Sequence, residues 1–519
     1  MEALENSQRL VEQLRQSPQA FSHPVGDAVP CIETHISWVL LAGEHAYKLK
    51  KPLVLDVLDF STLALRHAAC EEELRINRRT ASDLYLEVVP ITGTIRAPRV
   101  GGIGLVLDWA VHMRRFDQAA LCSRLIEQDG LLPAHIDQLA RQVADFHADA
   151  EVAPPDGRFG QPAVVRDVVH QNFGALDALE DADLCKTRDA VARWSEAEGA
   201  VLTPLLAQRL ADGHVRECHG DLHLGNLVLI KGAPQLFDAI EFNPALRWID
   251  VMADVAFLVM DLQARGRADL AWRFLNAYLE QTGDYAGLRV LPYYLSYRAM
   301  VRAKVAALRL AQLEGDARRP VAQELARYLR LAEQFTQPRG RWLWLTCGVS
   351  GSGKSSQTQP LIEARGVVRL RSDVERKRLF GLRPQSSSAG RAESLYTAEA
   401  THRTYGRLAA LARAVLHAGL PVLVDATFLR RTERDDFRGL ARELGVPCLI
   451  LAFDAPEAVL RARVRQRALA GGDASEADEA VLAAQLTHRE ELAADEWGQA
   501  LRVDTTMPVD WPVLLPTPV

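Results

Sequence analysis

The sequence has little of what marks exported, membrane-spanning or metal-stapled proteins. Its seven cysteines are an odd number, are scattered, and include no CxxC pair, which argues against a disulfide framework and against structural zinc. No apolar run approaches the roughly eighteen residues that a membrane span requires. The chain opens with the polar amphipathic segment MEALENSQRLVEQLRQ in place of a signal peptide. We therefore expect reduced thiols, no membrane partner and a cytoplasmic location.

Charge of neither sign dominates. With 61 Lys and Arg against 67 Asp and Glu, the formal net charge is −6, so no global field recruits nucleic acid or an anionic membrane, although a local basic groove is compatible with this balance. At 519 residues the chain is too long for one core, and it contains no internal repeat. Length therefore predicts roughly two to four domains.

One stretch combines three signals. Residues 342–356 read WLWLTCGVSGSGKSS, in which an apolar run typical of a buried strand passes directly into a glycine-rich turn. The turn fits GxxxxGK[ST], where backbone N–H groups close around phosphate oxygens. In that pattern Lys354 reaches the outer phosphates and Ser355 ligates Mg²⁺. A flexible linker would not explain this lysine and hydroxyl. The stretch predicts a site for ATP and Mg²⁺ made of Gly348, Ser350, Gly351, Ser352, Gly353, Lys354, Ser355 and Ser356.

The region after this loop alternates strand and helix patterns. The alternation predicts a parallel sheet with helices on both faces, which is the α/β architecture of P-loop NTPases. A short polar stretch with Pro and Gly, 336–341, precedes it. We therefore predict a separate domain over 340–519.

Acids stand where two of these strands end, and ligands of parallel sheets lie at the carboxyl ends of strands. Asp373 follows VVRLRS, where a carboxylate is placed to accept the proton of an acceptor hydroxyl, and Arg376 one turn on is placed to hold an anionic acceptor. Asp425 ends LPVLVDAT in the position of a Walker B acid, which holds the magnesium shell. Thr427 is a candidate substrate contact.

Two arginines of a later helical segment, LAFDAPEAVLRARVRQR, share one face. Arg463 and Arg467 are four residues apart. Nucleoside-monophosphate kinases use such a pair in a lid against adenine and the transferring phosphate, so we expect both to bind nucleotide. A solvated basic helix is the alternative.

The N-terminal half predicts a different architecture. In THISWVLLAGEHAYKLKK, two β-rich runs flank Gly43-Glu44, a hairpin signature, and period two puts Lys48 and Lys50 on one face. A helix over about 62–79 follows with the acids Glu71 to Glu73, and further strands come after it. A protein-kinase small lobe has the same order, which is a lysine on a hairpin, a glutamate on the following helix and then more strands. In that lobe the lysine binds the phosphates and the glutamate holds the lysine.

The kinase order continues in CHGDLHLGNLVLIKGAPQLFDAIEF. Asp221 is followed five residues later by Asn226, and Asp238 is expected on the second of two short strands. This is the spacing of a kinase catalytic loop and its metal-binding aspartate. His219 is read as a packing residue of the loop.

These motifs resemble the aminoglycoside and choline phosphotransferase family over roughly residues 30 to 330. The resemblance implies that Asp221 is the base for a substrate hydroxyl and that Asn226 and Asp238 are Mg²⁺ ligands. It also implies Lys48 as the phosphate-clamping lysine, with Glu73 as its partner. Spacing leaves Lys50 and Glu72 open as alternatives, and the kinase G-x-G-x-x-G cover is missing. Asp254 looks like the family's buried aspartate that hydrogen-bonds the catalytic-loop backbone.

Residues 340 to 505 resemble the P-loop kinases that include polynucleotide 5′-hydroxyl kinases, chloramphenicol phosphotransferase and zeta toxins. Beyond the loop, the matching pieces are RSDVER, LVDATFLRRTERDDF and GGDASEADEAVLAAQL. The fused order resembles a bacterial family described as bifunctional aminoglycoside phosphotransferase/ATP-binding proteins.

Together these patterns predict an α+β kinase-like domain over 1–335, with a β-rich small lobe and a helical large lobe, followed by the α/β P-loop domain. The predicted function is ATP-dependent transfer of the γ-phosphoryl group to an acceptor hydroxyl, by both halves, because each carries its own motif set. The partner is a small-molecule alcohol whose identity, like the oligomeric state, is not readable from the residues.

Two alternatives stay open at this point. One is a regulatory ATPase in which the kinase-like half binds without chemistry. The other is nucleic-acid 5′-hydroxyl kinase activity of the C-terminal half alone, which requires a basic groove near Asp373. The residues available for such a groove are Arg371, Arg376, Lys377, Arg378 and Arg383.

Overall fold

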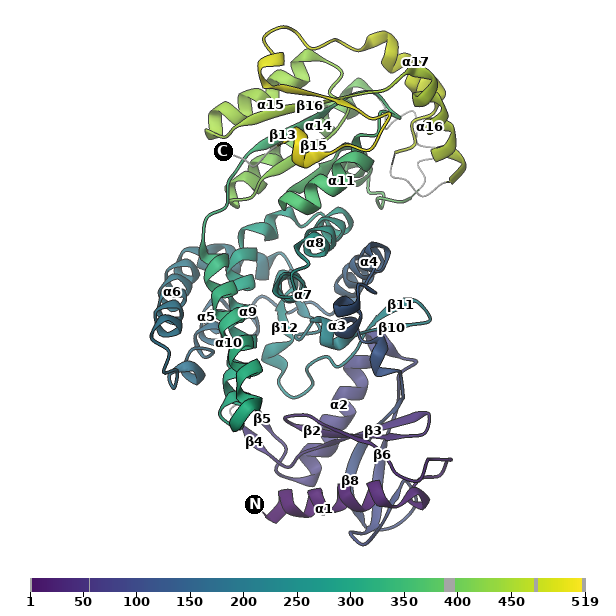
Figure 1. The fold of residues 1–519 in the computed structure, drawn as a ribbon, viewed down its shortest axis with the longest axis vertical. Coiled ribbons are helices and arrows are strands. Elements are labelled where there is room, and N and C mark those ends of the chain that lie inside the picture. The colour runs from purple at the N-terminus through teal and green to yellow at the C-terminus, as the bar shows by residue number, and fades with distance from the viewer. Residues whose placement is uncertain (1, 56, 387–396, 471–474, 516–519) are drawn as a thin grey trace. The chain divides into compact units, whose positions relative to one another are not determined.

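The computed structural model describes the whole chain except residues 1, 56, 387–396, 471–474 and 516–519. By packing, the chain divides into two compact units, Met1–Gln171 with Glu196–Asp261 and Asn172–Ser195 with Leu262–Val519 (Figure 1). Residues 262–335, which the sequence assigns to the first domain, pack within the second unit. The boundary at 335–340 stays a prediction about sequence domains. In the described parts of the chain, no helix combines the length and the apolar character that crossing a bilayer demands.

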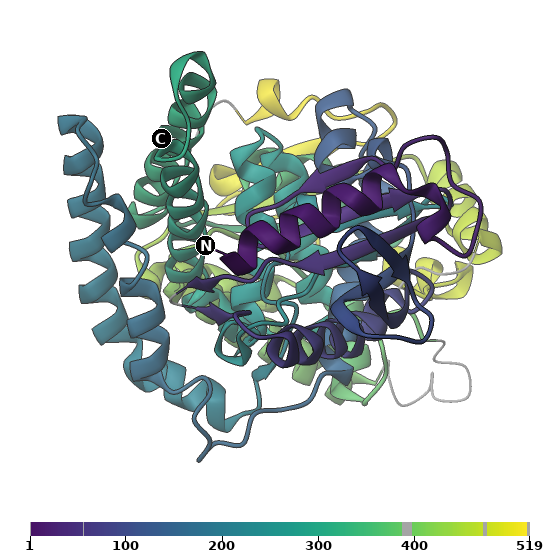
Figure 2. The same cartoon turned by 90° about the horizontal axis from the view of Figure 1, so that it is seen from below.

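A six-stranded antiparallel sheet in the order β1-β2-β3-β8-β6-β7 begins the first unit. The expected hairpin is confirmed, with Ala42 of one strand opposite His45 of the next. Side chains alternate between faces, so that Trp38 packs with α1 whereas Leu41 packs with α2. Helix α1 lies across one face of the sheet (Figure 2). The strands are β1 (Cys31–Glu33), β2 (Ser37–Ala42), β3 (His45–Lys50), β6 (Tyr85–Thr94), β7 (Ala97–Val100) and β8 (Val106–Arg114), and the helices are α1 (Glu2–Gln16) and α2 (Leu63–Ala81).

The rest of the first unit is mainly helical, with short two-stranded ribbons. Helices α6 and α7 each contribute residues to both units. The helices are α3 (Cys122–Leu125), α4 (Pro133–Asp149), α5 (Pro162–His170), α6 (Ala182–Ala211) and α7 (Val251–Ala264). The ribbons pair β4 (Val54–Leu55) with β5 (Leu58–Asp59), β9 (Val215–Glu217) with β12 (Trp248–Asp250), and β10 (Leu227–Ile230) with β11 (Ala233–Leu236).

The position of Asp238 differs from the expectation that it lies on a strand. Strand β11 ends at Leu236, and Asp238 has a φ of 62°. A left-handed residue cannot continue a strand. The turn is held by two backbone N–H groups, since Phe237 donates to the Asn226 carbonyl oxygen and Asp238 donates to the Tyr85 hydroxyl. The turn therefore brings this aspartate back beside the catalytic-loop segment.

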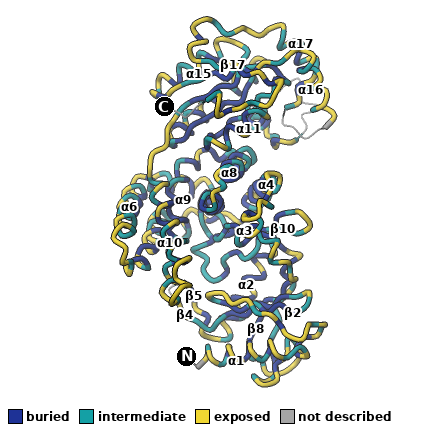
Figure 3. The backbone as a smooth tube through the Cα atoms, viewed as in Figure 1, coloured by how far each residue is buried: buried dark blue, intermediate teal, exposed yellow. Residues whose placement is uncertain are grey.

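The second unit is built on a parallel sheet of five strands in the order β14-β15-β13-β16-β17, as the alternating pattern predicts. Its central strands are buried (Figure 3), which fits their nearly continuous apolar sequence. The strands are β13 (Leu343–Cys347), β14 (Val368–Arg371), β15 (Val422–Asp425), β16 (Cys448–Asp454) and β17 (Ala500–Asp504).

The second unit also contains helices. Three of them, α8 to α10, precede the strands of the sheet in the sequence. Of the segment GGDASEADEAVLAAQL, residues 471–474 lie outside the described residues, and the remainder leads into α17. The helices are α8 (Ala268–Thr282), α9 (Leu291–Leu310), α10 (Arg318–Thr336), α11 (Lys354–Arg365), α12 (Ser372–Leu379), α14 (Ala398–His417), α15 (Arg431–Leu444), α16 (Glu457–Ala470), α17 (Glu479–His488) and α18 (Trp511–Leu514).

A buried ion pair ties α15 to the C-terminal segment. Arg434 donates to Glu496 at 2.6 and 3.0 Å, and neither residue is exposed. Arg434 also donates to the carbonyl oxygen of Phe428, in the loop that follows β15. Because this loop begins at the carboxyl end of β15, the pair fixes the wall of the region where Asp425 lies.

We expect Arg434→Leu to lower the free energy of unfolding by about 3–5 kcal/mol, because it leaves the Glu496 carboxylate buried without a counter-ion. Urea unfolding followed by circular dichroism measures the change. The control is Arg413→Leu, which breaks the exposed pair with Glu443 and should change the midpoint little. Equal losses in the two variants would contradict the assignment.

Candidate active sites

Buried charges of alternating sign form a row in the first unit. Lys48 donates to Glu73 at 2.8 Å and to Asp238 at 2.5 Å. Lys50 donates to the other oxygen of Glu73 and to Glu241. Both lysines and Glu73 are at most 8% exposed. Because Lys48 and Lys50 lie on the face of β3 that meets α2, one glutamate of the helix receives both ammonium groups.

This row keeps its charges despite burial. Burial lowers the pKa of Lys48. The carboxylates of Asp238 and Glu73 outweigh this effect and hold that pKa well above its usual value. Burial also opposes the ionised form of Glu73, yet Lys48 and Lys50 lower its pKa to about 2. Burial raises the pKa of Glu241, against the pull of Lys50. Glu73 is therefore the anion on which both cations depend.

The sequence spacing left open which lysine and which glutamate form the ion pair, and the structure shows the contacts of each. Both Lys48 and Lys50 contact Glu73, whereas Glu72 pairs with Arg75 and Arg247. A one-residue step along a helix turns the side chain by about 100°, so two adjacent glutamates face different partners.

The catalytic-loop residues lie close together. The Asn226 side-chain amide donates to the Asp221 carboxylate at 2.8 Å and lies 3.5 Å from the Asp238 carbonyl oxygen. Fully buried Asp254 accepts from the backbone N–H groups of His219 and Gly220 at 2.9 and 3.0 Å. The expected bond from this aspartate to the loop backbone is thus present. These hydrogen bonds hold the base of the loop, whereas the Asp221 side chain is 34% exposed.

His219 holds the loop rather than facing a ligand. Its Nδ1 accepts from the Asp221 backbone N–H at 3.3 Å, so its Nε2 carries the proton and donates to the Phe237 carbonyl oxygen at 2.9 Å. Burial lowers the pKa of His219, which keeps the ring neutral and this tautomer in place.

The donor set near this loop fits Mg²⁺. The Asn226 amide nitrogen is used by Asp221, which leaves its amide oxygen as a ligand. Asp238 offers a carboxylate whose side chain is 38% exposed. Oxygen donors of this kind are what Mg²⁺ prefers. Asn226 and Asp238 would hold the ion beside Lys48, the cation expected to meet phosphate.

In the second unit, the glycine-rich loop is curled. Gly351 and Gly353 have φ values of 79° and 83°. A Cβ on Gly348 would lie 2.6 Å from the Phe453 carbonyl oxygen, and one on Gly351 would lie 2.7 Å from the Leu460 carbonyl oxygen. Only glycine fits at these positions. The tight cradle for phosphate that the motif predicts is therefore formed.

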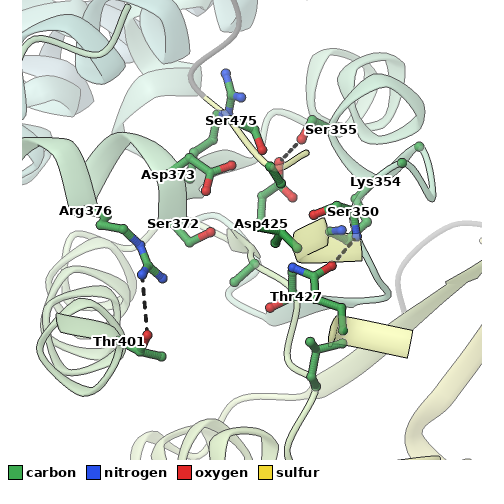
Figure 4. Close-up of a pocket in the computed structure, with 18 of the residues that line it drawn as sticks. Ser350, Lys354, Ser355, Ser372, Asp373, Arg376, Thr401, Asp425, Thr427 and Ser475 are labelled. Carbon is green, nitrogen blue, oxygen red and sulfur yellow. Dashed lines mark hydrogen bonds between the residues drawn. The ribbon is translucent and has the colours of Figure 1, made fainter. Parts of the chain in front are cut away.

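Polar side chains follow the loop at the start of α11. Lys354 donates to the carbonyl oxygens of Gly348 and Val349 at 2.8 and 3.0 Å. Burial lowers its pKa, and the carboxylates of Asp425 and Asp373 oppose that shift. Ser355 donates to Asp425 at 2.6 Å (Figure 4). A hydroxyl and a carboxylate in contact at the cradle are oxygen donors that fit Mg²⁺.

A cavity of about 920 Å³ opens in front of this loop. Among the residues predicted from the sequence, Gly348 and Ser352 do not line it, and Ser352 is buried behind the loop. The predicted residues that line it are Ser350, Gly351, Gly353, Lys354, Ser355, Ser356, Asp373, Arg376, Asp425, Thr427, Arg463 and Arg467.

The far side of the cavity carries the expected acceptor residues. Asp373 lies in the first turn of α12, directly after β14, and Arg376 donates to Thr401 at 3.4 Å (Figure 4). Thr427 lies 3.5 Å from the Tyr405 hydroxyl, oxygen to oxygen. An acid, a cation and a hydroxyl thus face the same cavity as the phosphate cradle.

Arg463 and Arg467 of α16 line the cavity, and each also donates to oxygen atoms of the protein. Arg463 donates to the hydroxyl and carbonyl oxygens of Thr505 at 2.9 and 2.6 Å, and Arg467 donates to the Ala477 carbonyl oxygen at 2.8 Å. The shared face predicted for α16 is therefore directed at the site.

Sequence reasoning missed part of this lining. Gln485 of α17 accepts from the Ser350 backbone N–H at 2.7 Å, and Val481 and His488 line the cavity with it. Their spacing of four and three residues is a single helical face, which was a usable signal. Tyr405 was also missed as a lining residue, whereas Arg371, which ends β14 and lines the cavity, was named only for a basic groove near Asp373.

Two family models match the chain, the phosphotransferase enzyme family over residues 57–291 and the AAA domain over residues 343–492. Proteins of Mycobacterium tuberculosis and Mycobacterium bovis, each described as an uncharacterized protein, are 30% identical to it over 493 residues, which is 94% of this chain and 95% of theirs. The chain belongs to their family. It joins a phosphotransferase-family region to a P-loop kinase-like region, so both resemblances expected from the motifs are confirmed.

Two solved structures are similar to parts of the chain. A choline/ethanolamine kinase family protein from Mesorhizobium loti is 13% identical, with 63% of this chain and 99% of that chain covered and a TM-score of 0.35. A gluconokinase from Sinorhizobium meliloti 1021 is 23% identical, with 33% and 86% covered and a TM-score of 0.24. What those proteins act on does not carry over to this family member.

In the first unit we expect Glu73→Gln to slow phosphoryl transfer roughly a hundredfold, about 2.7 kcal/mol in the barrier, because both buried lysines lose their shared anion. Initial rates with γ-labelled ATP measure the effect. Glu72→Gln is the matched control one residue away, and it should keep a rate near that of the unaltered chain. A similar loss in both variants would show that general disturbance of α2 is responsible.

Proposed function

We propose that each unit transfers the γ-phosphoryl group of ATP to an acceptor hydroxyl, which makes the chain a bifunctional phosphotransferase. The observation that carries the proposal is the cavity of the second unit, where Lys354, the Ser355–Asp425 pair and Asp373 face one space. The match of residues 57–291 to the phosphotransferase enzyme family supports the reaction class for the first unit.

In the second unit the loop amides and Lys354 bind the phosphates and hold them against the cavity. Ser355 and Asp425 would hold Mg²⁺, which would supply neutralisation of charge on the phosphate oxygens. Asp373 accepts the proton as the acceptor oxygen bonds to the γ-phosphorus and the bond to the bridging oxygen breaks, releasing ADP. Arg376 binds an anionic group of the acceptor, so we favour an alcohol that also carries a carboxylate or a phosphate.

In the first unit Asp221 orients and deprotonates the acceptor hydroxyl, and Asn226 and Asp238 are the residues that would hold Mg²⁺. Lys48 is placed to move from its carboxylate partners to the phosphates. Lys50, which also bonds to Glu241, then stays as the counter-ion of Glu73, so the movement of the Lys48 ammonium group does not leave Glu73 without a cation.

The nucleic-acid alternative for the second unit has weaker support. Two of the basic residues that would build its groove are engaged within the protein, since Lys377 pairs with Glu476 and Arg378 pairs with Glu375. Detection of a 5′-phosphorylated oligonucleotide as a product would support this alternative. The regulatory alternative requires ATP consumption that yields free phosphate and no phosphorylated alcohol.

We expect Lys354→Ala to remove the labelled products of the second unit from a screen of hydroxyl compounds with the full chain and γ-labelled ATP. Asp373→Asn should leave nucleotide binding in place and lower transfer roughly a hundredfold or more, in the range expected for a lost proton acceptor. Products that persist in Lys354→Ala at full yield would reject the site.

We expect Asp221→Asn to remove a different set of products, those of the first unit, without change in the unfolding midpoint. The products that depend on Lys354 should stay, because the two sites use separate residues. An unchanged product list for Asp221→Asn would exclude this residue as the proton acceptor.

A further inference from the structure

Helix α8 closes one edge of the P-loop sheet. Strand β14 is the edge strand of that sheet. The buried side chain of Asn276 donates to the Val367 carbonyl oxygen at 3.0 Å and accepts from the Arg369 backbone N–H at 2.7 Å. Its amide thus makes the two hydrogen bonds that a neighbouring strand would make. Figure 1 shows α8 beside α11 in the second unit.

One turn further along α8, Glu280 joins this edge to the phosphate site. It accepts from Arg369 at 2.9 and 3.1 Å and lies 3.6 Å from an Arg371 guanidinium nitrogen. Arg369 in turn donates to the carbonyl oxygen of Ser355 at 3.3 Å. Arg371 lines the cavity. A single carboxylate therefore holds one arginine that contacts the cradle helix and another that faces the acceptor side.

The position of Glu280 is itself fixed. Its carbonyl oxygen accepts from Arg378 of α12 at 2.6 Å, and its side chain is only 12% exposed. Arg369 has 9% of its side chain exposed. Low exposure makes these charge-assisted bonds strong and makes an unpaired guanidinium costly.

We propose that Glu280 is a positioning residue of the P-loop site. Helix α8 lies inside the segment matched to the phosphotransferase enzyme family, 57–291, and not in the segment matched to the AAA domain, 343–492. The site in the second half of the sequence is thus completed by a residue from the first family's segment. This inference rests on the proposed function in one respect, which is that the acceptor binds on the side of the cavity where Arg371 lies.

The test is the variant Glu280→Gln of the full chain. The quantity measured is the Lys354-dependent rate of ATP consumption, which is the total rate minus the rate that remains when Lys354→Ala is also present. We expect this rate to fall at least tenfold. With an acceptor found in the hydroxyl screen, the KM for that acceptor should rise, because Arg371 loses its fixed orientation. Glu280→Asp, which keeps the charge, should recover part of the loss.

The matched control is Glu363→Gln. It breaks a second ion pair of the same helix, Arg273 with Glu363 at 2.8 Å, which contacts neither β14 arginine. We expect Glu363→Gln to stay within about twofold of the unaltered chain. Normal Lys354-dependent turnover in Glu280→Gln, or an equal loss in both variants, overturns the proposal.

Two further outcomes are separable. If Glu280→Gln does not fold, Arg371→Gln decides the matter: a tenfold loss supports the positioning role and an unchanged rate overturns it. If ATP consumption yields only free phosphate, the proposed transfer to an alcohol fails, yet the contrast between Glu280→Gln and Glu363→Gln still tests the inference. Absence of any Lys354-dependent turnover overturns both.

Discussion

Both candidate sites depend on one constraint, which is that a charged group inside a protein needs a partner before its ligand arrives. Lys48 rests on Glu73 and Asp238, and Lys354 rests on the carbonyl oxygens of its own loop. Ser355 is likewise engaged with Asp425. Burial without such partners costs several kcal/mol per ion, roughly as much as many proteins have in stability. The groups are held in place by contacts that a nucleotide can exchange for its own.

The two units meet this constraint by different means. The first unit relies on side chains, because its row of five charges alternates in sign and its loop is braced by the carboxylate of Asp254. The second relies on backbone, because Gly351 and Gly353 adopt left-handed conformations of the kind that form anion-binding concavities of backbone N–H groups. A backbone cradle needs a fixed local sequence, whereas a charge row needs a fixed tertiary structure. This difference explains why the backbone cradle was easier to predict from the sequence than the charge row.

Local patterns predicted much of the fold. Period-two alternation placed Lys48 and Lys50 on one face, and the glycine motif gave both the loop and its strand. Residues brought in by tertiary structure were not predicted. Glu241 meets Lys50 from 191 positions away, and Gln485 meets Ser350 from 135 positions away. No window of sequence contains such pairs. The strand expected at Asp238 failed for a local reason, since one left-handed residue ends a strand even inside an apolar run.

The covered edge of β14 has a practical consequence for work with fragments. A parallel edge strand that loses its cover presents free N–H and C=O groups to any other chain. A fragment that begins near residue 340 would omit Asn276 and bare the backbone of Val367 and Arg369. Such a fragment would self-associate through this edge. A soluble form of the nucleotide-binding half should begin ahead of α8, and aggregation of shorter fragments would say nothing about the native chain.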